Sequence, residues 1–395
     1  MKGKIFVANI GSSSRKYALF DSGHCLGEAR MEIRPEGIRM TTGQRSEGKA
    51  PLSEADYRNG AGVFLGLLLE WKCIENPQEI HAVCLRIVAP GSFFQANRRV
   101  DDAFLKALRG VQDMAPLHLE PTLAESERLR ELFPTLPFLG ISDSAFHAGL
   151  PPEAREYAIS HADAARWDIH RFGYHGISVQ SILRKLGTRP GGPPERIIVC
   201  HLGSGASVTA VRNGKSLDTS MGFSPLEGLV MGTRAGDMDV AAALYLGKRA
   251  GLDPQALQEY LNSRCGLMGL SGATSDLRAL LEKEESGDGP ARLAVEIFVY
   301  RIRKYIGAYA TALEGLDALV FTAAIGERSP AIRQRICQGL EWMGLALDPD
   351  ANGSGASDRF IHASGSRVQV SVMATEEMRE MARQSAEDPG LKMHP

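Results

Sequence analysis

The side chains best suited to chemistry stand at the ends of apolar runs or between glycines. Arg86 interrupts an otherwise apolar stretch, and Asp143 directly follows another, while His175 and Arg234 lie in glycine-flanked loops. A cation inside an apolar strand needs an anionic partner or ligand, because an unpaired buried charge is costly. The planar arginine fork suits a carboxylate or a phosphate, and an aspartate at a strand end suits a metal ion or an oriented water.

Each of these residues also has an ordinary structural explanation. Arg86 could snorkel from an edge strand or pair with a nearby acid, and Arg234 could be a surface arginine in a glycine loop. A histidine between glycines is more often a surface or structural residue, and Asp143 could cap a helix. Glu376 could ligate magnesium, but a favourable charge in the first turn of a helix is the default explanation. The functional interpretation therefore depends on partners from other segments.

Three turns that follow strands could bind phosphate groups. The first, Gly11–Ser14, combines a permissive glycine with small residues whose N–H groups are accessible, and Lys16 lies just beyond it. The second is Gly203–Gly205, and the third is Ala324–Arg328, which lies at a helix N-terminus where anions bind well. None matches a P-loop or a dinucleotide-binding fingerprint, and each alone could be an ordinary turn.

The first two turns belong to a repeated pattern of strands. The first turn joins two strands, which are followed by a hairpin turn and a third strand. The same succession recurs over residues 197–220, with His201 aligned to Asn9 and Gly203 to Gly11 without a gap. An internal repeat of this kind predicts a duplicated α/β domain, with its two glycine turns facing each other across a cleft.

Local signals elsewhere predict loops and helix starts. Residues 34–60 are polar and glycine-rich without a clear period, which favours mostly loop. Residues 114–118 are also expected to form a loop, followed by a helix from about Pro121 to Leu132. Ser178 and Thr375 are expected to cap the helices that follow them.

Composition places the chain among ordinary globular proteins. Its 395 residues are enough for two domains, and its formal net charge of −2 indicates neither a nucleic-acid partner nor a membrane surface. The 6 cysteines are scattered without a CxxC pair, which favours a reducing cytoplasm over a disulfide or zinc framework. No apolar run is long enough to span a membrane.

Long stretches of the chain resemble the acetate kinase, or acetokinase, family. The most specific is the run 218–228, DTSMGFSPLEG. The other matching stretches follow in the family's order: Asn9 to Tyr17, Met114 to His118, Asp143 to His147, Gly173 to Gly176, His201 to Ser207, Ser275 to Arg278, Phe321 to Glu327 and Thr375 to Glu377.

The resemblance implies an actin-like, sugar-kinase-like (ASKHA) ATPase fold, in which two ribonuclease-H-like α/β domains surround a nucleotide cleft. The expected domains are 1–150 with 374–395, and 151–373.

The resemblance also implies a reaction. Family members transfer the γ-phosphoryl group of ATP in line and reversibly to a short carboxylate, giving ADP and an acyl phosphate, with Mg²⁺ (or Mn²⁺) and usually as homodimers. Acetate is the first candidate acid, and propionate or a similar short acid is the next. The alternative is an ATP-binding paralogue with little turnover and a regulatory or interaction role. A sugar or glycerol kinase is disfavoured, because such enzymes use a carboxylate base toward a hydroxyl group.

Carried over position by position, the resemblance assigns roles to residues of this chain. Arg86 would hold the substrate carboxylate, and Asp143 would be the active-site acid. His175 and Arg234 would stabilise the transition state, in which charge neutralisation and positioning matter more than covalent chemistry. The residues expected to hold the metal ion are Asn9 and Glu376.

Two larger sets of binding residues are also implied. The residues expected to contact ATP are Ser12, Lys16, His201, Leu202, Gly203, Ser204, Gly205, Asp276, Leu277, Arg278, Ala324, Ile325, Gly326, Glu327 and Arg328. The residues expected to line the pocket for the methyl group of the substrate are Val88, Leu117 and Pro225.

The chain departs from the family's pattern in the substrate loop and at the first and third of the phosphate candidates. Around Arg86 the two flanking histidines are absent, and Pro90 stiffens the loop. Arg15 replaces an apolar residue on the first phosphate turn, and Arg328 replaces an asparagine beside the expected adenosine site. These changes leave the preferred acid open.

Overall fold

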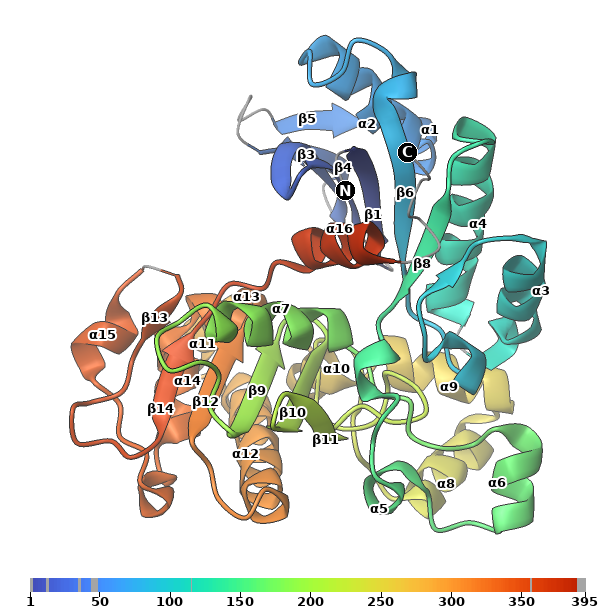
Figure 1. Ribbon diagram of the computed structural model, residues 1–395. Coiled ribbons are helices and arrows are strands. Elements are labelled where there is room, and N and C mark those ends of the chain that lie inside the picture. Colours follow the sequence, from blue (N-terminus) through green and yellow to red (C-terminus); the bar gives the residue numbers. More distant parts are fainter. Residues whose placement is uncertain are drawn as a thin grey trace. The chain divides into compact units, whose positions relative to one another are not determined.

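The structure is a computed structural model, and it describes residues 3–11, 14–34, 37–43, 49–114, 116–355 and 357–388. The chain divides into two compact units. The first comprises Met1–Ala145 with Glu376–Pro395, and the second comprises Phe146–Thr375. Each unit is built on its own mixed β-sheet, and the ribbon in Figure 1 labels their elements.

The first unit consists of a sheet and the helices packed on it. Its strands are β1 (Lys4–Ile10), β2 (Ser14–Asp21), β3 (His24–Arg34), β4 (Gly37–Thr42), β5 (Lys49–Leu52), β6 (Ile80–Ile87), β7 (Arg98–Arg99) and β8 (Phe138–Ser142). Its helices are α1 (Glu54–Arg58), α2 (Gly60–Glu70), α3 (Asp102–Gly110), α4 (Pro116–Leu132) and α16 (Glu377–Glu387). The strand order is β5-β4-β3-β2-β1-β6-β8-β7, in which β1, β6 and β8 run parallel.

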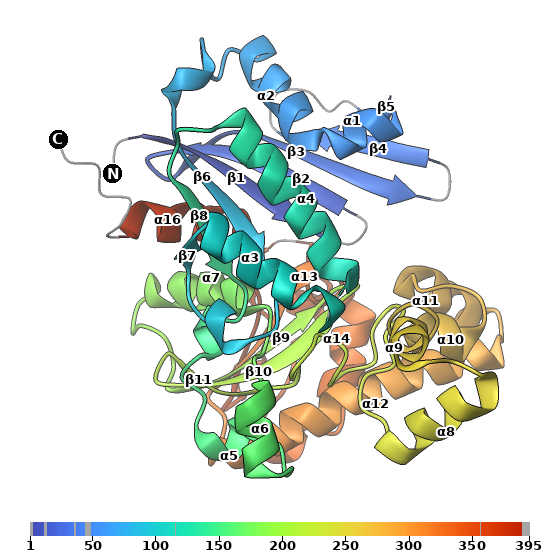
Figure 2. The ribbon, with the colours of Figure 1, turned by 90° about the vertical axis from the view of Figure 1, so that its right-hand side faces the viewer.

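Alternation along the central strands decides which side chains reach each face of this sheet. The even-numbered apolar residues of β1 join a core cluster with α2, α3 and α4, so Asn9 points to the other face. That face receives α16, and Figure 2 shows α4 and α16 on opposite sides of β1 and β6. In β6, Leu85 and Ile87 belong to the same core cluster, so Arg86 shares the face of Asn9.

Arg15 follows the same rule and points away from that face. In β2 it is Lys16 that lies opposite Asn9 of β1. Arg15 is buried on the core side, where its guanidinium pairs with Glu125 of α4 and lies 5.0 Å from the ring centroid of Tyr57. Burial raises the pKa of Glu125, and Arg15 opposes that shift. The departure at Arg15 therefore places an ion pair in the core rather than a cation beside the phosphate turn.

The second unit repeats this plan. Its strands are β9 (Arg196–Leu202), β10 (Ala206–Arg212), β11 (Lys215–Thr219), β12 (Ala318–Thr322), β13 (Arg359–Phe360) and β14 (Gln369–Val372). Its helices are α5 (Pro152–Arg155), α6 (His161–Trp167), α7 (Gly176–Gly187), α8 (Val240–Ala250), α9 (Pro254–Ser263), α10 (Gly266–Ser271), α11 (Leu277–Glu285), α12 (Gly289–Ala312), α13 (Ala323–Arg328), α14 (Pro330–Cys337) and α15 (Pro349–Gly353).

The order of strands confirms the duplication expected from the repeat. The second sheet runs β11-β10-β9-β12-β14-β13, which matches β3-β2-β1-β6-β8-β7 of the first sheet strand for strand. In both sheets the first three strands of this series are antiparallel, the next pairings are parallel, and the final edge pairing is antiparallel. The fold is thus the duplicated α/β architecture of the actin-like and sugar-kinase-like ATPases.

Several local expectations differ from the structure. The range 34–60 contains β4, β5 and α1 rather than a loop, because the outer strands of an antiparallel sheet can expose one face to water and so need few apolar residues. Helix α4 begins at Pro116, where proline suits the first helical position, and it continues through Pro121. Helix α7 begins after His175, and α16 after Glu376, so neither Ser178 nor Thr375 is the N-cap. None of the described helices has the length and hydrophobicity that a membrane span requires.

Candidate active site

Four of the expected functional residues come together where the parallel strands of the first unit end. Asn9 and Arg86 are the penultimate residues of β1 and β6, and Asp143 directly follows β8. The Nη2 atom of Arg86 donates to Oδ2 of Asp143 at 2.8 Å, and its Nη1 donates to Oδ1 of Asn9 at 3.4 Å. Lys16 lies opposite Asn9 in the pairing of β1 with β2.

The charges in this cluster depend on one another. Burial alone would lower the pKa of Arg86, but Asp143 and then Glu377 reverse the shift and raise it. Burial lowers the pKa of Lys16, and Glu377 opposes that shift. The Nε atom of Arg86 is buried and has no hydrogen-bond partner among the described residues. Arg86 is therefore a fixed cation with an unused donor, as a carboxylate-binding residue requires.

The acid beside Asn9 is Glu377, whereas the sequence pattern favoured Glu376. The amide of Asn9 donates to Oε2 of Glu377 at 3.1 Å, and Glu377 is buried. The side chain of Glu376 is 38% exposed and lies 3.5 Å from Arg379. Helix periodicity distinguishes the two acids, because Glu377 lies on the buried face of α16 with Met381 and Ser385.

Asn9, Asp143 and Glu377 supply oxygen ligands of the kind that magnesium accepts. Asp143 is fully buried, and Glu377 is nearly so. In the described ranges, no group of three or more His, Cys, Asp or Glu side chains converges into a complete metal site. Magnesium in phosphoryl-transfer sites is usually bound by one or two carboxylates together with waters and phosphate oxygens, so this small set fits it.

A second group of expected residues gathers in the second unit, on the sheet face that α7 covers. Ile197 and Val199 of β9 pack with α7, so His201 points to the same face by alternation. Ser207 of β10 and Thr322 of β12 flank His201 in the strand register. Each of the three strands therefore contributes one polar residue, and the three residues are neighbours across the strands.

His175 is held against His201 by a strained backbone. It precedes α7 with a φ of 62°, a left-handed conformation that non-glycine residues seldom adopt. Its ring stacks on that of His201 with centroids 4.0 Å apart, and its Nδ1 lies 2.9 Å from Oγ of Ser207. Strain of this kind persists only where the surroundings fix the residue, which is common at functional sites.

Arg234 and His175 both lie close to the turn Gly203–Gly205. A Cβ atom built on Gly205 would be 3.6 Å from Nη1 of Arg234 and 3.6 Å from Nε2 of His175. The N–H of Gly203 donates to the carbonyl of Gly205 at 3.0 Å, which closes the turn. Arg234 also donates to the carbonyl of Pro225 at 3.4 Å. Two of the residues expected to stabilise the transition state therefore flank the second phosphate turn.

The third phosphate candidate forms α13, and a residue that the sequence analysis missed anchors it. Ala323 opens the helix with a φ of 64°. Arg333 of α14 is fully buried, and its Nη1 donates to the carbonyls of Gly326 and Glu327 at 2.9 Å each. Burial lowers the pKa of Arg333 to about 10. The sequence offered one signal for the role of Arg333, which is a positive charge between Ile332 and Ile336 on an otherwise apolar helix face.

The remaining expected residues are dispersed. Asp276 is the N-cap of α11 and pairs with Arg278, whose side chain is 84% exposed and which lowers the pKa of Asp276. Val88 is half-buried directly after β6, and Pro225 is buried. The side chain of Leu117 and the whole of Ser12 lie outside the described residues.

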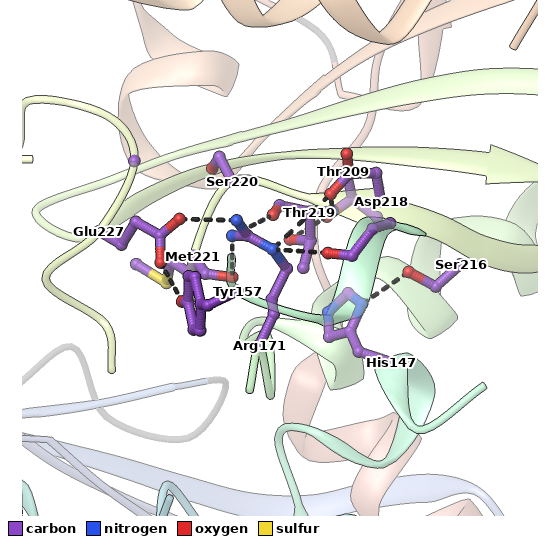
Figure 3. Close-up of polar contacts among 12 residues, drawn as sticks. His147, Tyr157, Arg171, Thr209, Ser216, Asp218, Thr219, Ser220, Met221 and Glu227 are labelled. Atoms are coloured by element: carbon purple, nitrogen blue, oxygen red, sulfur yellow. Dashed lines mark hydrogen bonds and ion pairs between the residues drawn. The ribbon is translucent and has the colours of Figure 1, made fainter. Parts of the chain in front are cut away.

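A partly buried polar network, shown in Figure 3, supports the loop that carries Pro225. The guanidinium of Arg171 donates to the carbonyls of Ala154 at 3.1 Å, Thr219 at 3.0 Å and Met221 at 3.2 Å. It also donates to the carboxylate of Glu227 at 2.6 Å. Burial by itself would lower the pKa of Arg171, but Glu227 reverses the shift and raises it.

Glu227 extends this network to the loop itself. It accepts from the hydroxyl of Tyr157, and that hydroxyl accepts from the N–H of Phe223 at 2.8 Å. Phe223 and Pro225 belong to the same short loop, whose Pro225 carbonyl accepts from Arg234. The network thus fixes the backbone to which Arg234 is bound.

His147 supports the neighbouring loop in a similar way (Figure 3). Its Nε2 donates to the carbonyl of Tyr174 at 3.0 Å, so its Nδ1 accepts from the hydroxyl of Ser216 at 2.8 Å. A Cβ atom on Gly173 would lie only 2.7 Å from the His147 ring, so glycine is required there. The residue just before His175 is therefore held by a fully buried histidine.

Comparison with known proteins identifies the family of the chain. A model of the acetokinase family matches residues 4–383. The chain is 40% identical to the acetate kinase of Dictyoglomus turgidum, covering 99% of this chain and 98% of that one, and 39% identical to that of Thermotoga maritima, covering 97% and 98%.

Solved structures give the same result. The crystal structure of a propionate kinase from Francisella tularensis superposes with a TM-score of 0.88 at 32% identity, covering 97% of this chain and 98% of that one. The crystal structure of Porphyromonas gingivalis acetate kinase gives a TM-score of 0.86 at 32% identity, covering 97% and 99%. This chain therefore belongs to the acetokinase family.

Proposed function

We propose that this acetokinase transfers the γ-phosphoryl group of ATP to a short carboxylate, acetate first and propionate next, giving ADP and an acyl phosphate. The observation that carries the proposal is Arg86, whose side chain is only 15% exposed, pairs with Asp143 and keeps an Nε donor without a hydrogen-bond partner among the described residues. Two curated relatives are named acetate kinase and one structural relative is named propionate kinase, so both acids are candidates. The alternative of an ATP-binding paralogue with little turnover is not favoured, because the cations and acids of the reaction are all present.

The charges of the side chains suggest the role of each residue in the reaction. The guanidinium of Arg86 would bind the carboxylate of the acceptor, and Asp143 would keep that guanidinium oriented. His175 and Arg234 would donate to the oxygens of the transferring phosphoryl group, where negative charge is spread in the transition state. No covalent enzyme intermediate is needed, because in-line transfer requires positioning and neutralisation.

A divalent metal, Mg²⁺ with Mn²⁺ as a substitute, would be held by Asn9, Asp143 and Glu377. When bound it neutralises charge on the phosphate oxygens of ATP. Glu377 takes the place first given to Glu376 because it contacts Asn9. Asn9 would orient Glu377 by its amide, and Lys16 would add positive charge near the phosphates.

The nucleotide would be bound by one turn, the start of α11 and the short helix α13 of the second unit. The end of β9 and the turn that follows it, from His201 to Gly205, would approach the phosphates with backbone N–H groups. The segment 276–278 and helix α13 would contact the nucleoside, and both Ala324 and Arg328 are exposed on that helix. Arg328 would then alter contacts to the base or ribose without touching the transferred group.

A hydroxamate-trapping assay tests the proposed reaction. The protein is incubated with ATP, Mg²⁺, hydroxylamine and one acid from a series of short carboxylates. Acyl hydroxamate is expected with acetate and propionate, with a falling yield for longer acids as the methyl pocket is exceeded. Glu377→Gln is expected to raise the Mg²⁺ concentration needed for half-maximal rate, and Glu376→Gln is the matched control. Absence of hydroxamate with every acid would exclude the kinase assignment.

We also propose that the chain forms a homodimer through α8 of the second unit. Apolar side chains lie exposed on one side of this helix: Val240 at 73%, Leu244 at 64% and Tyr245 at 65%. Exposed apolar patches of this kind usually mark protein contacts, and a second copy can cover the same patch by two-fold symmetry.

Sedimentation velocity measures this association. The wild-type protein is expected to sediment as two chains, and Leu244→Asp is expected to shift it toward one chain, because a charge would be buried in the contact. Trp342→Asp is the matched control, since Trp342 is 70% exposed in the same unit but outside α8. A wild-type protein that sediments as one chain at all concentrations would contradict the proposal.

A further inference from the structure

His175 and His201 each direct Nδ1 to a serine hydroxyl. Nδ1 of His175 lies 2.9 Å from Oγ of Ser207, and Nδ1 of His201 lies 2.8 Å from Oγ of Ser178. Both serines are fully buried. A neutral imidazole has one nitrogen that donates and one that accepts, so the direction of these two bonds decides which ring nitrogen carries the proton.

Thr375 decides the direction at His201. Its hydroxyl donates to Oγ of Ser178 at 2.9 Å. Ser178 must then place its own proton, and among its side-chain contacts in the described ranges Nδ1 of His201 is the remaining acceptor. If Ser178 accepted from His201 instead, its buried hydroxyl proton would have no partner, which is unfavourable. Ser178 therefore donates to Nδ1, and the His201 proton is on Nε2.

The same argument applies to Ser207. The hydrogen bond of its hydroxyl within the described part of the chain is the one to Nδ1 of His175. A buried hydroxyl that only accepted there would again leave its proton without a partner. Ser207 therefore donates, and His175 also carries its proton on Nε2. The buried His147, whose Nε2 donates to a carbonyl, adopts the same tautomer in this unit.

We propose that Ser178, together with Thr375, and Ser207 are positioning residues that hold His201 and His175 in the neutral Nε2–H tautomer. The inference deepens the proposed function and rests on it, because Nε2–H is the group that would donate to a phosphate oxygen. Nε2 of His175 and Nη1 of Arg234 each lie 3.6 Å from the position that a Cβ atom on Gly205 would occupy. The two rings stack 4.0 Å apart, and two imidazolium ions at that distance would repel strongly. Neutral donors avoid that repulsion and still supply two N–H groups.

Nitrogen NMR of the protein labelled with ¹⁵N-histidine measures the tautomers directly. Spectra are recorded without nucleotide or metal at about pH 8, above the ordinary histidine pKa of about 6.5. His175→Gln and His201→Gln identify the two sets of signals. A protonated Nε2 and an unprotonated Nδ1 are expected for both rings. A protonated Nδ1 at either ring overturns the inference for that residue.

Substitutions at Thr375 separate positioning from a purely structural role. Thr375→Val keeps the shape and removes the hydroxyl, so Ser178 becomes free to accept, and Nδ1 of His201 is expected to gain proton occupancy. A fall in kcat of about fivefold to tenfold is expected, with the KM for ATP changed less, because the loss is that of one oriented hydrogen bond. Thr375→Ser keeps the hydroxyl and is expected to retain both the wild-type spectrum and the wild-type kcat.

Thr209→Val is the matched control, since it removes a buried hydroxyl that contacts Thr219 on the same sheet. If Thr375→Val resembles this control in spectrum and in kcat, the inference is overturned. The spectra need no turnover, so they remain decisive if the kinase assay is negative. A chain that turns over while Nδ1 is protonated would refute the tautomer assignment and leave the proposed function intact.

Discussion

Replacing Arg86 by alanine is expected to lower kcat/KM for the carboxylate by at least about a hundredfold, because losing one preorganised charged donor typically costs about 10²–10³ in rate. The KM for ATP is expected to change little, since Arg86 belongs to the cluster assigned to the acid. The substitution also removes the guanidinium that pairs with the fully buried Asp143. Removing one partner of a buried ion pair typically costs about 3–5 kcal/mol, so thermal unfolding must be measured alongside the kinetics.

Two further variants separate these effects. Arg86→Lys keeps the charge beside Asp143 but loses the planar fork, so near-normal stability is expected with a clearly raised KM for the acid. Arg130→Ala removes a surface arginine that pairs with Asp102 in the same unit, and wild-type kinetics and stability are expected. Wild-type KM and kcat for the acid in a folded Arg86→Ala protein would show that Arg86 does not bind the substrate.

Alternation along strands explains why much of this cluster could be predicted from the sequence. An apolar strand that carries one polar residue, as β1 carries Asn9 and β6 carries Arg86, fixes the face of that residue once the core face is known. The same rule would have placed Arg15 on the core side, because it is one residue before Lys16. The resemblance to the family drew attention to Arg15 as a change at the phosphate turn, whereas its position in the strand shows that it is part of the core.

Other features depend on contacts between distant segments, so no local pattern in the sequence predicts them. Glu376 and Glu377 are equivalent by type, and only the start of α16 and its packing against the first sheet distinguish them. The pairing of Thr375 with Ser178 joins residues nearly two hundred positions apart, as the separation of 197 shows. Cap propensity singled out both residues as helix caps, whereas in the structure their hydroxyl groups bond to each other. A hydroxyl group that suits a helix cap also suits a buried hydrogen-bond network.

The network around Arg171 is the clearest case of a feature that only tertiary contacts reveal. Arg171 precedes Phe172 by one residue and has no sequence signal beyond its proximity to the family stretch at Gly173. In the structure its guanidinium bonds three carbonyls and one carboxylate, and its side chain is only 16% exposed. Such a residue fixes backbone rather than binding substrate.

Arg171→Ala is accordingly expected to lower the free energy of unfolding by about 3–5 kcal/mol, because it leaves Glu227 and several carbonyls without their partner. Chemical denaturation with a two-state fit measures the loss. Where the variant remains folded, kcat is expected to fall, since the loop of Pro225 would no longer hold Arg234 in place. ATP is expected to bind nearly as before, because Arg171 contacts none of the residues assigned to the nucleotide.

A conservative variant and a surface variant complete this test. Arg171→Lys keeps the charge near Glu227, but its three N–H donors cannot serve three carbonyls and a carboxylate at once, so an intermediate loss of stability is expected. Arg292→Ala removes an exposed arginine of α12, 66% exposed beside Glu296, and is expected to change stability by less than about 0.5 kcal/mol. Equal stability of Arg171→Ala and Arg292→Ala would mean that the network contributes nothing to folding. Because both arginines lie in the second unit, that comparison separates the effect of the buried network from the loss of one positive charge in that unit.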